Sequence, residues 1–181
     1  MLQDILLEHC YPTLSNLKFA NMINVDYTEN IFEDILKLNE KLSEYNFSLI
    51  ILKQTEKKLL LYLINYNLIE NYNDKRLKKA LESYGYPVDN FNSSINFLKK
   101  RLLENEFPHE IGFFLGYPYE DVLGFINYNG KNECISGKWK VYSDVERAKN
   151  IFKKYDYAKQ ITKRLSLQGN NLFDIINYFK E

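Results

Sequence analysis

Two pairs of adjacent residues in this chain carry side chains that could take part in catalysis. His9 and Cys10 form the first pair, and His109 and Glu110 form the second. A histidine can act as a general base, and a carboxylate can orient it. The thiol of Cys10 becomes a nucleophile only if a base lies within hydrogen-bond reach, and adjacent side chains usually diverge. Cys10 with His109 is therefore the plausible catalytic pair, provided that the fold brings them together.

Both pairs also have a structural interpretation. Cys10 can be a small buried apolar residue, as free cysteines often are. His109 follows Pro108 and can hydrogen-bond the loop at the entrance of a buried strand. A zinc site of the H-E-x-x-H type is excluded, because position 113 is Phe113. Cys10 and Cys134 are the two cysteines of the chain, too few for a tetrahedral cysteine zinc site. The sequence therefore predicts no metal site.

The residues after the second pair could line a pocket for a flat ligand. Five of the seven glycines lie between Gly112 and Gly137, but their spacing matches neither the dinucleotide-binding fingerprint nor the Walker loop. Aromatic side chains near a sheet more often belong to the core than to a binding site. The residues that we expect to contact a ligand are His9, His109, Glu110, Tyr117, Asp121, Trp139 and Tyr142.

Composition places the chain among soluble globular proteins. It has 181 residues, of which 45% are hydrophobic and 27% charged. The 24 basic residues balance the 24 acidic ones, so no net field recruits nucleic acid or an anionic membrane. No apolar run approaches the roughly 18 to 20 residues that span a bilayer, and no signal-peptide pattern opens the chain. We expect one cytoplasmic domain, residues 1–181, without nucleic-acid or membrane partners.

Hydrophobic periodicity predicts the elements that position these residues. In the first half we expect a short helix over residues 1–8, a helix from Thr28 to about Asn46, and a hairpin formed by "FSLIILK" and "KLLLYLIN". Both hairpin runs are apolar on successive residues, so both faces should be covered. In the second half we expect helices over about 74–84 and 91–102, followed by a buried strand over 111–115. A helix from Pro118 to Gly130 and an alternating strand over 138–142 come next. The chain then forms a helix from a Ser143–Glu146 capping box to about Ser166 and a last helix after Gly169.

These elements add up to an α+β fold. We expect a small, mainly antiparallel sheet of about four strands packed by about five to seven helices. In this arrangement His109 lies at the mouth of the strand over 111–115. We therefore expect His109 and Glu110 to be partly exposed, with His9 and Cys10 packed close by.

Three stretches of the chain carry a resemblance to a known family. They are "EHCYPTLSNLKFANM", "FPHEIGFFLGYPYEDVLGFINYNGKN" and "GKWKVYSDVERAKNIFKKY". They resemble an uncharacterised domain-of-unknown-function family of small proteins from clostridia and related anaerobic Firmicutes, with the pattern HCxPTL, FPHEIGxFLGYPxxDVxGFI and WKVYxD. Relatives look richer in cysteine around Cys134 and after Asp144, which weakens any mechanism based on a cysteine cluster. The resemblance implies no activity and leaves both histidine pairs intact.

Two functional hypotheses follow. The first is a non-catalytic protein that binds a small ligand or a partner protein around His109, Tyr117 and Trp139. Its sign would be a groove lined by aromatic residues, without an aligned nucleophile and base. The alternative is an enzyme or redox accessory protein that uses Cys10 or His109, with haem or flavin as a conceivable cofactor. Its sign would be convergence of both histidine pairs in one concave site.

Overall fold

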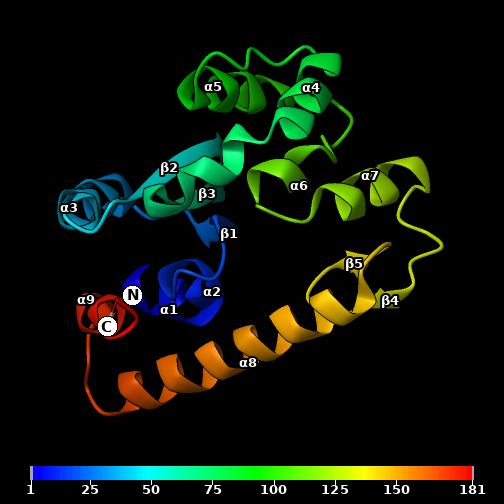
Figure 1. The fold of residues 1–181 in the computed structure, drawn as a ribbon. Coiled ribbons are helices and arrows are strands. Elements are labelled where there is room, and N and C mark those ends of the chain that lie inside the picture. Colours follow the sequence, from blue (N-terminus) through cyan, green and yellow to red (C-terminus); the bar gives the residue numbers. More distant parts are fainter. Residues whose placement is uncertain (1, 181) are drawn as a thin grey trace. The chain divides into compact units, whose positions relative to one another are not determined.

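The structure is a computed structural model that describes residues 2–180. The chain groups into two compact units, which are described separately (Figure 1). The sheet unit comprises Met1–Ile69 and Lys154–Glu181, and the central unit comprises Glu70–Lys153. The boundaries fall within the 3-10 segment η1 (Tyr66–Asn73) and within the helix α8 (Val145–Leu167). The expectation of a single domain stays a prediction.

The sheet unit is built on the hairpin expected from the sequence. Strands β2 (Phe47–Gln54) and β3 (Lys58–Asn65) pair antiparallel, and β1 (Ala20–Asp26) pairs with the other edge of β3. Within residues 2–180 the order of this sheet is β1-β3-β2 (Figure 1). β3 takes the centre and is buried on both faces, as its continuous apolar run predicts. β2 lies at an edge and does not meet the expectation that both of its faces are covered: Phe47, Leu49 and Leu52 are buried, whereas Ile50 and Ile51 are half-buried.

One face of this sheet carries the main hydrophobic core. Leu59, Leu61 and Leu63 of β3 point to that face, and Ile23 of β1 lies opposite Leu61. Three helices cover this face, two from the first part of the chain and one from the last. They are α1 (Leu2–His9), α3 (Ile31–Ser43) and α9 (Leu172–Tyr178), and each contributes buried leucine or isoleucine side chains. α1 packs against α9, so the two ends of the chain close one core.

A buried polar joint fixes the "PTLSN" stretch to the sheet. It forms the short helix α2 (Tyr11–Leu14) and the turn that follows. The fully buried Asn65 donates to Asn16 Oδ1 at 2.7 Å and to the Thr13 carbonyl at 3.4 Å. Thr13 Oγ1 in turn donates to Asn21 Oδ1 at 2.7 Å. Because buried polar groups are costly without partners, these hydrogen bonds account for the polar residues of the motif without a ligand.

The central unit is mainly helical. Its helices α4 (Lys75–Ser83) and α5 (Phe91–Arg101) are confirmed, and Asp74 and Asn90 cap them through their side chains. Helix α7 (Tyr119–Asn127) begins after Pro118, as expected, and Gly130 follows its end with a positive φ of 69°. The two-residue strands β4 (Ile135–Ser136) and β5 (Lys140–Val141) form a small antiparallel pair, and β5 packs against α7.

The expected buried strand over Ile111–Leu115 is wrong. These residues form a single helical turn, α6 (Ile111–Phe114). Ile111 N donates to the Pro108 carbonyl and Leu115 N to the Ile111 carbonyl, both at 3.0 Å. All five residues are buried, as expected. A run of five apolar residues buried on every side has no periodicity, so its pattern cannot distinguish a strand from a helical turn.

Three further boundaries differ from expectation. The strand expected over 138–142 is reduced to Lys140–Val141, because the neighbouring residues bond to α7 instead of to β4. The Ser143–Glu146 capping box is wrong: Asp144 Oδ1 accepts from Arg147 N at 3.0 Å and caps α8. Thr28 does not cap α3, which begins at Ile31 without a side-chain cap. The last helix is confirmed, with a capping box formed by Asn171 and Asp174.

The fold class is confirmed as α+β. Residues 2–180 contain a three-stranded and a two-stranded antiparallel sheet together with helices, of which α2 and α6 are single turns that the sequence pattern did not reveal. Among these residues no helix combines the length and the apolar character that a membrane crossing requires.

The central strand provides a test of the sheet unit. Leu61 is fully buried, whereas Leu36 on α3 is 66% exposed. Leu61→Ala should lower the free energy of unfolding by about 2 to 5 kcal/mol, because it leaves a cavity in the core. Leu36→Ala is the matched control and should change it by less than about 0.5 kcal/mol. Denaturant unfolding followed by circular dichroism measures both, and equal effects would contradict the assignment of β3 to the core.

Candidate functional site

An aromatic pocket lies in the central unit between the α6–α7 segment and the loop around β5. Its volume is about 320 Å³. The aromatic residues of its lining are Phe107, His109, Tyr117, Phe125 and Trp139. The aliphatic side chains of Ile111, Leu115 and Val122 complete its apolar wall, and Asp121, Lys138 and Lys140 are its charged residues. The pocket therefore gathers four of the residues expected to contact a ligand: His109, Tyr117, Asp121 and Trp139.

His109 contributes an exposed imidazole to the lining. Its ring lies between Phe107, at 5.7 Å between centroids, and Phe125, at 5.1 Å. Pro108 beside it is buried and provides the carbonyl that opens the α6 turn. The backbone at His109 is thereby fixed while the ring remains accessible to a ligand. The expected exposure of His109 is confirmed.

Glu110 is not exposed, contrary to expectation. Its side chain is buried, and Oε1 accepts from Tyr86 Oη at 3.0 Å and from Arg101 Nε at 3.2 Å. Burial and the adjacent Glu110 carboxylate raise the pKa of Tyr86 above its usual value, so this phenol stays protonated and donates. Glu110 therefore joins α6 to α5 and to the loop before α5. Among residues 2–180, the Glu110 side chain bonds to Tyr86 and Arg101 and not to His109.

Asp121 is the best-connected polar residue of the site. It lies in the first turn of α7 and is 3% exposed. Oδ2 accepts from Trp139 Nε1 at 2.7 Å. Oδ1 accepts from Tyr142 N at 2.8 Å, from Ser143 N at 3.1 Å and from Ser143 Oγ at 3.0 Å. We call this arrangement the Asp121 latch, because one carboxylate holds the segment 139–143 against α7.

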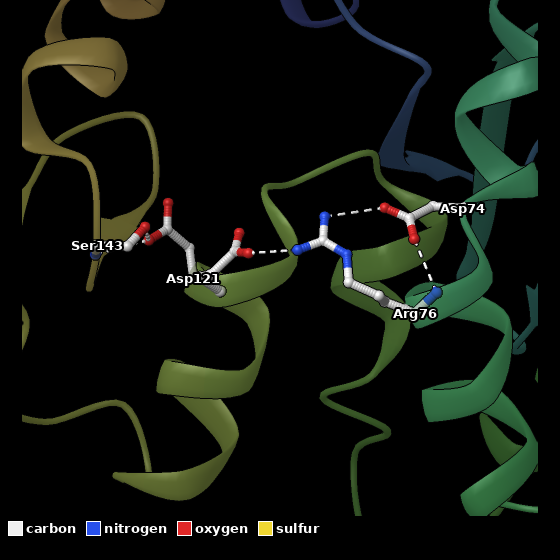
Figure 2. Close-up of polar contacts among 5 residues, drawn as sticks. Asp74, Arg76, Asp121 and Ser143 are labelled. Atoms are coloured by element: carbon white, nitrogen blue, oxygen red, sulfur yellow. Dashed lines mark hydrogen bonds and ion pairs between the residues drawn. The ribbon is translucent and has the colours of Figure 1, made fainter.

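The neighbouring acid, Glu120, forms an ion pair with Arg76. Arg76 Nη1 pairs with Glu120 Oε1 at 2.8 Å, and Arg76 Nη2 pairs with Asp74 Oδ2 at 3.0 Å. The guanidinium also lies over the Tyr119 ring, 5.0 Å from its centroid. Figure 2 shows Arg76 beside Asp74 on one side of α7 and Asp121 directed toward Ser143 on the other. The start of α7 is thus anchored on two sides.

Trp139 forms one wall of the pocket. Its ring meets Phe152 edge-on at 4.5 Å and lies 5.7 Å from Tyr117, measured between centroids. An alternating strand over 138–142 would place Trp139 fully in the core, but the indole is half-buried, and its N–H donates to Asp121. Burial raises the pKa of the Tyr117 phenol, which keeps this second aromatic wall uncharged at neutral pH.

An alternating strand over 138–142 would place both Lys138 and Lys140 in open solvent, but only Lys138 is exposed. Lys138 is exposed and lines the pocket. Lys140 is half-buried, and its Nζ donates to the Gly130 carbonyl at 2.6 Å and pairs with Glu133 Oε1 at 2.9 Å. Lys140 therefore ties the loop after α7 to β5.

Tyr142 supports the site without lining it. Its backbone N–H belongs to the Asp121 latch, and its ring stacks on Tyr128 at 6.0 Å between centroids. A Cβ atom at Gly124 would overlap the Tyr142 ring, so glycine at that position allows the close packing of β5 on α7.

His9 and Cys10 belong to the sheet unit. His9 is exposed, with Nε2 3.9 Å from Glu8 Oε2. Cys10 is fully buried, and burial raises the pKa of its thiol to about 12, an effect that the nearby Lys18 only partly offsets. The same burial lowers the pKa of the Lys18 amine to about 8. Cys10 is therefore a neutral thiol at physiological pH and not an activated nucleophile. Convergence of His9 with His109 stays a prediction.

Eight residues of the lining were not among those expected to contact a ligand: Phe107, Ile111, Gly112, Leu115, Val122, Phe125, Lys138 and Lys140. Phe125 and Lys140 lie within the family pattern, but that pattern does not mark them as lining residues, and only the packing of β5 on α7 brings them together. Phe107 did leave a signal in the sequence, because it is a large aromatic residue in a polar stretch before Pro108, where no apolar periodicity would bury it; in the structure it is 53% exposed. Within residues 2–180 no group of three or more His, Cys, Asp or Glu side chains could hold a metal ion.

Comparison with known families agrees with the motifs that these elements carry. Residues 6–176 match the family described as "Protein of unknown function (DUF3793)". The chain belongs to this family. Comparison with curated proteins and with solved structures gave no match. The family match spans both histidine pairs, the Asp121 latch and Trp139.

The Asp121 latch can be tested by removing one acceptor. In Asp121→Asn an amide N–H₂ replaces one carboxylate oxygen and faces at least one N–H donor. We expect the free energy of unfolding to fall by about 1 to 3 kcal/mol, with a change in the fluorescence of Trp139, the single tryptophan of the chain. Asp144→Asn is the control, because asparagine caps a helix as well as aspartate does. If both variants lower the free energy of unfolding by the same amount, the latch does not hold the segment 139–143.

The burial of Cys10 predicts unequal thiol reactivity. Cys10 is buried and Cys134 is exposed, and both are free thiols. In the folded protein a disulfide reagent such as 5,5′-dithiobis(2-nitrobenzoate) should modify only Cys134. At about pH 9, above the usual cysteine pKa of about 8.5, Cys10 should still not react, because its pKa is raised to about 12. Rapid modification of Cys10 in the Cys134→Ser variant would contradict this assignment.

Proposed function

We propose that this protein is a non-catalytic binding protein that takes a small ligand into the aromatic pocket. The observation that carries the proposal is an open, apolar-walled pocket of about 320 Å³ next to the exposed imidazole of His109. Ligand sites are typically concave and mostly apolar, with a few polar groups that fix orientation. The volume lies at the lower end of the roughly 300 to 1,000 Å³ that such sites enclose, which favours a small molecule over a protein partner.

The walls of the pocket are held in place before any ligand binds. The latch fixes Trp139 to the first turn of α7, and Lys140 fixes the loop that follows α7. Glu110 fixes the turn that precedes α6. A preformed site loses little conformational entropy on binding, so more of the contact energy contributes to affinity. This rigidity supports a binding role.

The alternative, an enzyme or redox accessory protein with a haem or flavin, has weaker support. Catalysis by His109 would need a second group to orient or protonate it. The two buried carboxylates of this segment are engaged in internal hydrogen bonds, Glu110 through Oε1 and Asp121 through both oxygens. Cys10 carries a thiol whose pKa is about 12. The exposed imidazole of His109 is the observation that favours this alternative.

We also place the protein in the cytoplasm, in a reducing compartment. Both cysteines are free thiols, as is usual where glutathione and thioredoxin keep thiols reduced. The balanced charge of the chain supports a small-molecule ligand over nucleic acid.

The binding role can be tested through the single indole N–H of the chain. Trp139 gives one indole cross-peak in a ¹H–¹⁵N correlation spectrum, and it reports on the pocket wall. A library of one- and two-ring compounds should contain members that shift this peak saturably. Leu115→Phe enlarges a side chain in the lining. It should raise the dissociation constants of those compounds at least about tenfold, because overpacking a filled site costs about 1 to 3 kcal/mol.

The control applies the same substitution outside the pocket. Leu103 is 69% exposed and does not line it, so Leu103→Phe should leave each dissociation constant unchanged. If no compound shifts the indole peak, or if Leu115→Phe and Leu103→Phe behave alike, the proposed binding role is wrong.

A further inference from the structure

We infer that the ligand of this pocket is an uncharged aromatic ring compound with a carbonyl-type acceptor, and that His109 recognises this acceptor. The inference rests on the proposed function and adds the chemical class of the ligand and the residue that selects it. It follows from three properties of the lining: its aromatic rings, its engaged charges and the accessible imidazole of His109.

The aromatic side chains of the lining favour a ring as the ligand. Trp139 and Tyr117 lie 5.7 Å apart between centroids, with their planes inclined by 37°. His109 and Phe125 form a second pair, at 5.1 Å and 58°. Rings meet other rings preferentially in offset-stacked or edge-to-face geometry. An aromatic ligand therefore gains contacts in this pocket that an aliphatic ligand of the same size does not.

The lining is not equipped to hold a cationic ligand. Asp121 is its one carboxylate, among lining residues that all lie within 2–180. An ionised carboxylate offers about four lone-pair sites. Asp121 already receives hydrogen bonds from Trp139 Nε1, Tyr142 N, Ser143 N and Ser143 Oγ. A ligand ammonium or amidinium would therefore find no carboxylate with capacity for its protons.

The two lysines of the lining are engaged as well. Lys140 Nζ donates to the Gly130 carbonyl at 2.6 Å and pairs with Glu133 Oε1 at 2.9 Å. Lys138 also has an interaction partner. Neither lysine is therefore a free cation that would attract an anionic ligand. A charged ligand would lose its hydration on entry without gaining a free counter-charge, whereas a neutral ligand avoids this cost.

His109 supplies the polar contact that such a ligand needs. Among residues 2–180 its imidazole contacts the rings of Phe107 and Phe125 and makes no hydrogen bond. The ring carries an N–H in either tautomer and in the protonated form, whereas its accepting nitrogen exists only in the neutral form. The hydroxyl of Tyr117 can donate or accept and favours neither kind of ligand. The imidazole therefore selects an acceptor on the ligand, such as a carbonyl oxygen.

Four one-ring probes of nearly the same shape test the inference. Acetophenone carries the neutral acceptor, isopropenylbenzene has a CH₂ group in place of the carbonyl oxygen, 1-phenylethylamine is a cation at neutral pH, and benzoate is an anion. Each is titrated into the full chain while the indole cross-peak of Trp139 is followed. Acetophenone should bind at least about threefold more tightly than isopropenylbenzene, the effect of one net hydrogen bond. Both ions should bind at least about tenfold more weakly than acetophenone, because their lost hydration is not replaced.

The role of His109 is tested by a variant that keeps an aromatic ring. His109→Phe removes the N–H and should bring the dissociation constants of acetophenone and isopropenylbenzene to a ratio of about one. The constant for isopropenylbenzene should stay within about twofold, because the ring contacts remain. The matched control is His9→Phe at the other histidine of the chain, which is exposed and does not line the pocket. It should leave every ratio unchanged.

The possible results separate this inference from the proposed function. Equal dissociation constants for acetophenone and isopropenylbenzene, with a saturable indole shift, would overturn the selection of an acceptor and leave a binding pocket in place. A preference that survives in His109→Phe would overturn the role of His109. Tightest binding of benzoate or of 1-phenylethylamine would contradict an uncharged ligand. If no probe moves the indole peak, the inference fails, and the proposed function fails with it only if the compound library gives no shift either.

Discussion

The central unit depends on one buried carboxylate. Asp121 accepts four hydrogen bonds, three of them from the backbone and side chain of Tyr142 and Ser143 and one from the indole of Trp139. A buried charge is tolerated only when its hydrogen bonds are complete, so the segment from Trp139 to Ser143 and the first turn of α7 specify each other. β5 is only two residues long, and it cannot hold this segment through its strand hydrogen bonds alone. The pocket wall exists because the latch holds it.

The need of a buried acid for hydrogen-bond partners also explains Glu110, the other buried acid of the central unit. Glu110 is adjacent to His109 in sequence, which suggests an acid and base acting together. Successive residues of a turn point in different directions, however, and the buried Glu110 meets Tyr86 and Arg101 while His109 faces outward. One residue of the pair therefore holds the turn, and the other is available to a ligand. This division of roles is what favours binding over acid–base catalysis.

The N-terminal motif has a structural role in the sheet unit. Cys10 and Thr13 are fully buried, and the polar residues that follow bond to Asn65 at the end of β3. A motif that contains a histidine, a cysteine and a threonine looks chemical in a sequence. In the folded unit it fills a core and satisfies a buried amide, and only His9 of this group reaches the solvent.

The sequence by itself determined the elements whose patterns are long enough to show a period. Helices α3, α4, α5 and α9 and the β2–β3 hairpin follow from repeated apolar positions and from turn residues, because local sterics and one buried face decide them. Gly85 and Gly130, after α4 and α7, mark turns with positive φ, also as local chemistry requires. His109, Tyr117, Asp121 and Trp139 were expected together from their types. Tertiary structure alone decided the rest: the helical turn at Ile111–Phe114, the use of Asp121 and Glu110 as internal acceptors, and the presence of Phe125 and Lys140 in the pocket. These features depend on which partners reach a side chain from distant parts of the chain, and no local period or spacing records that.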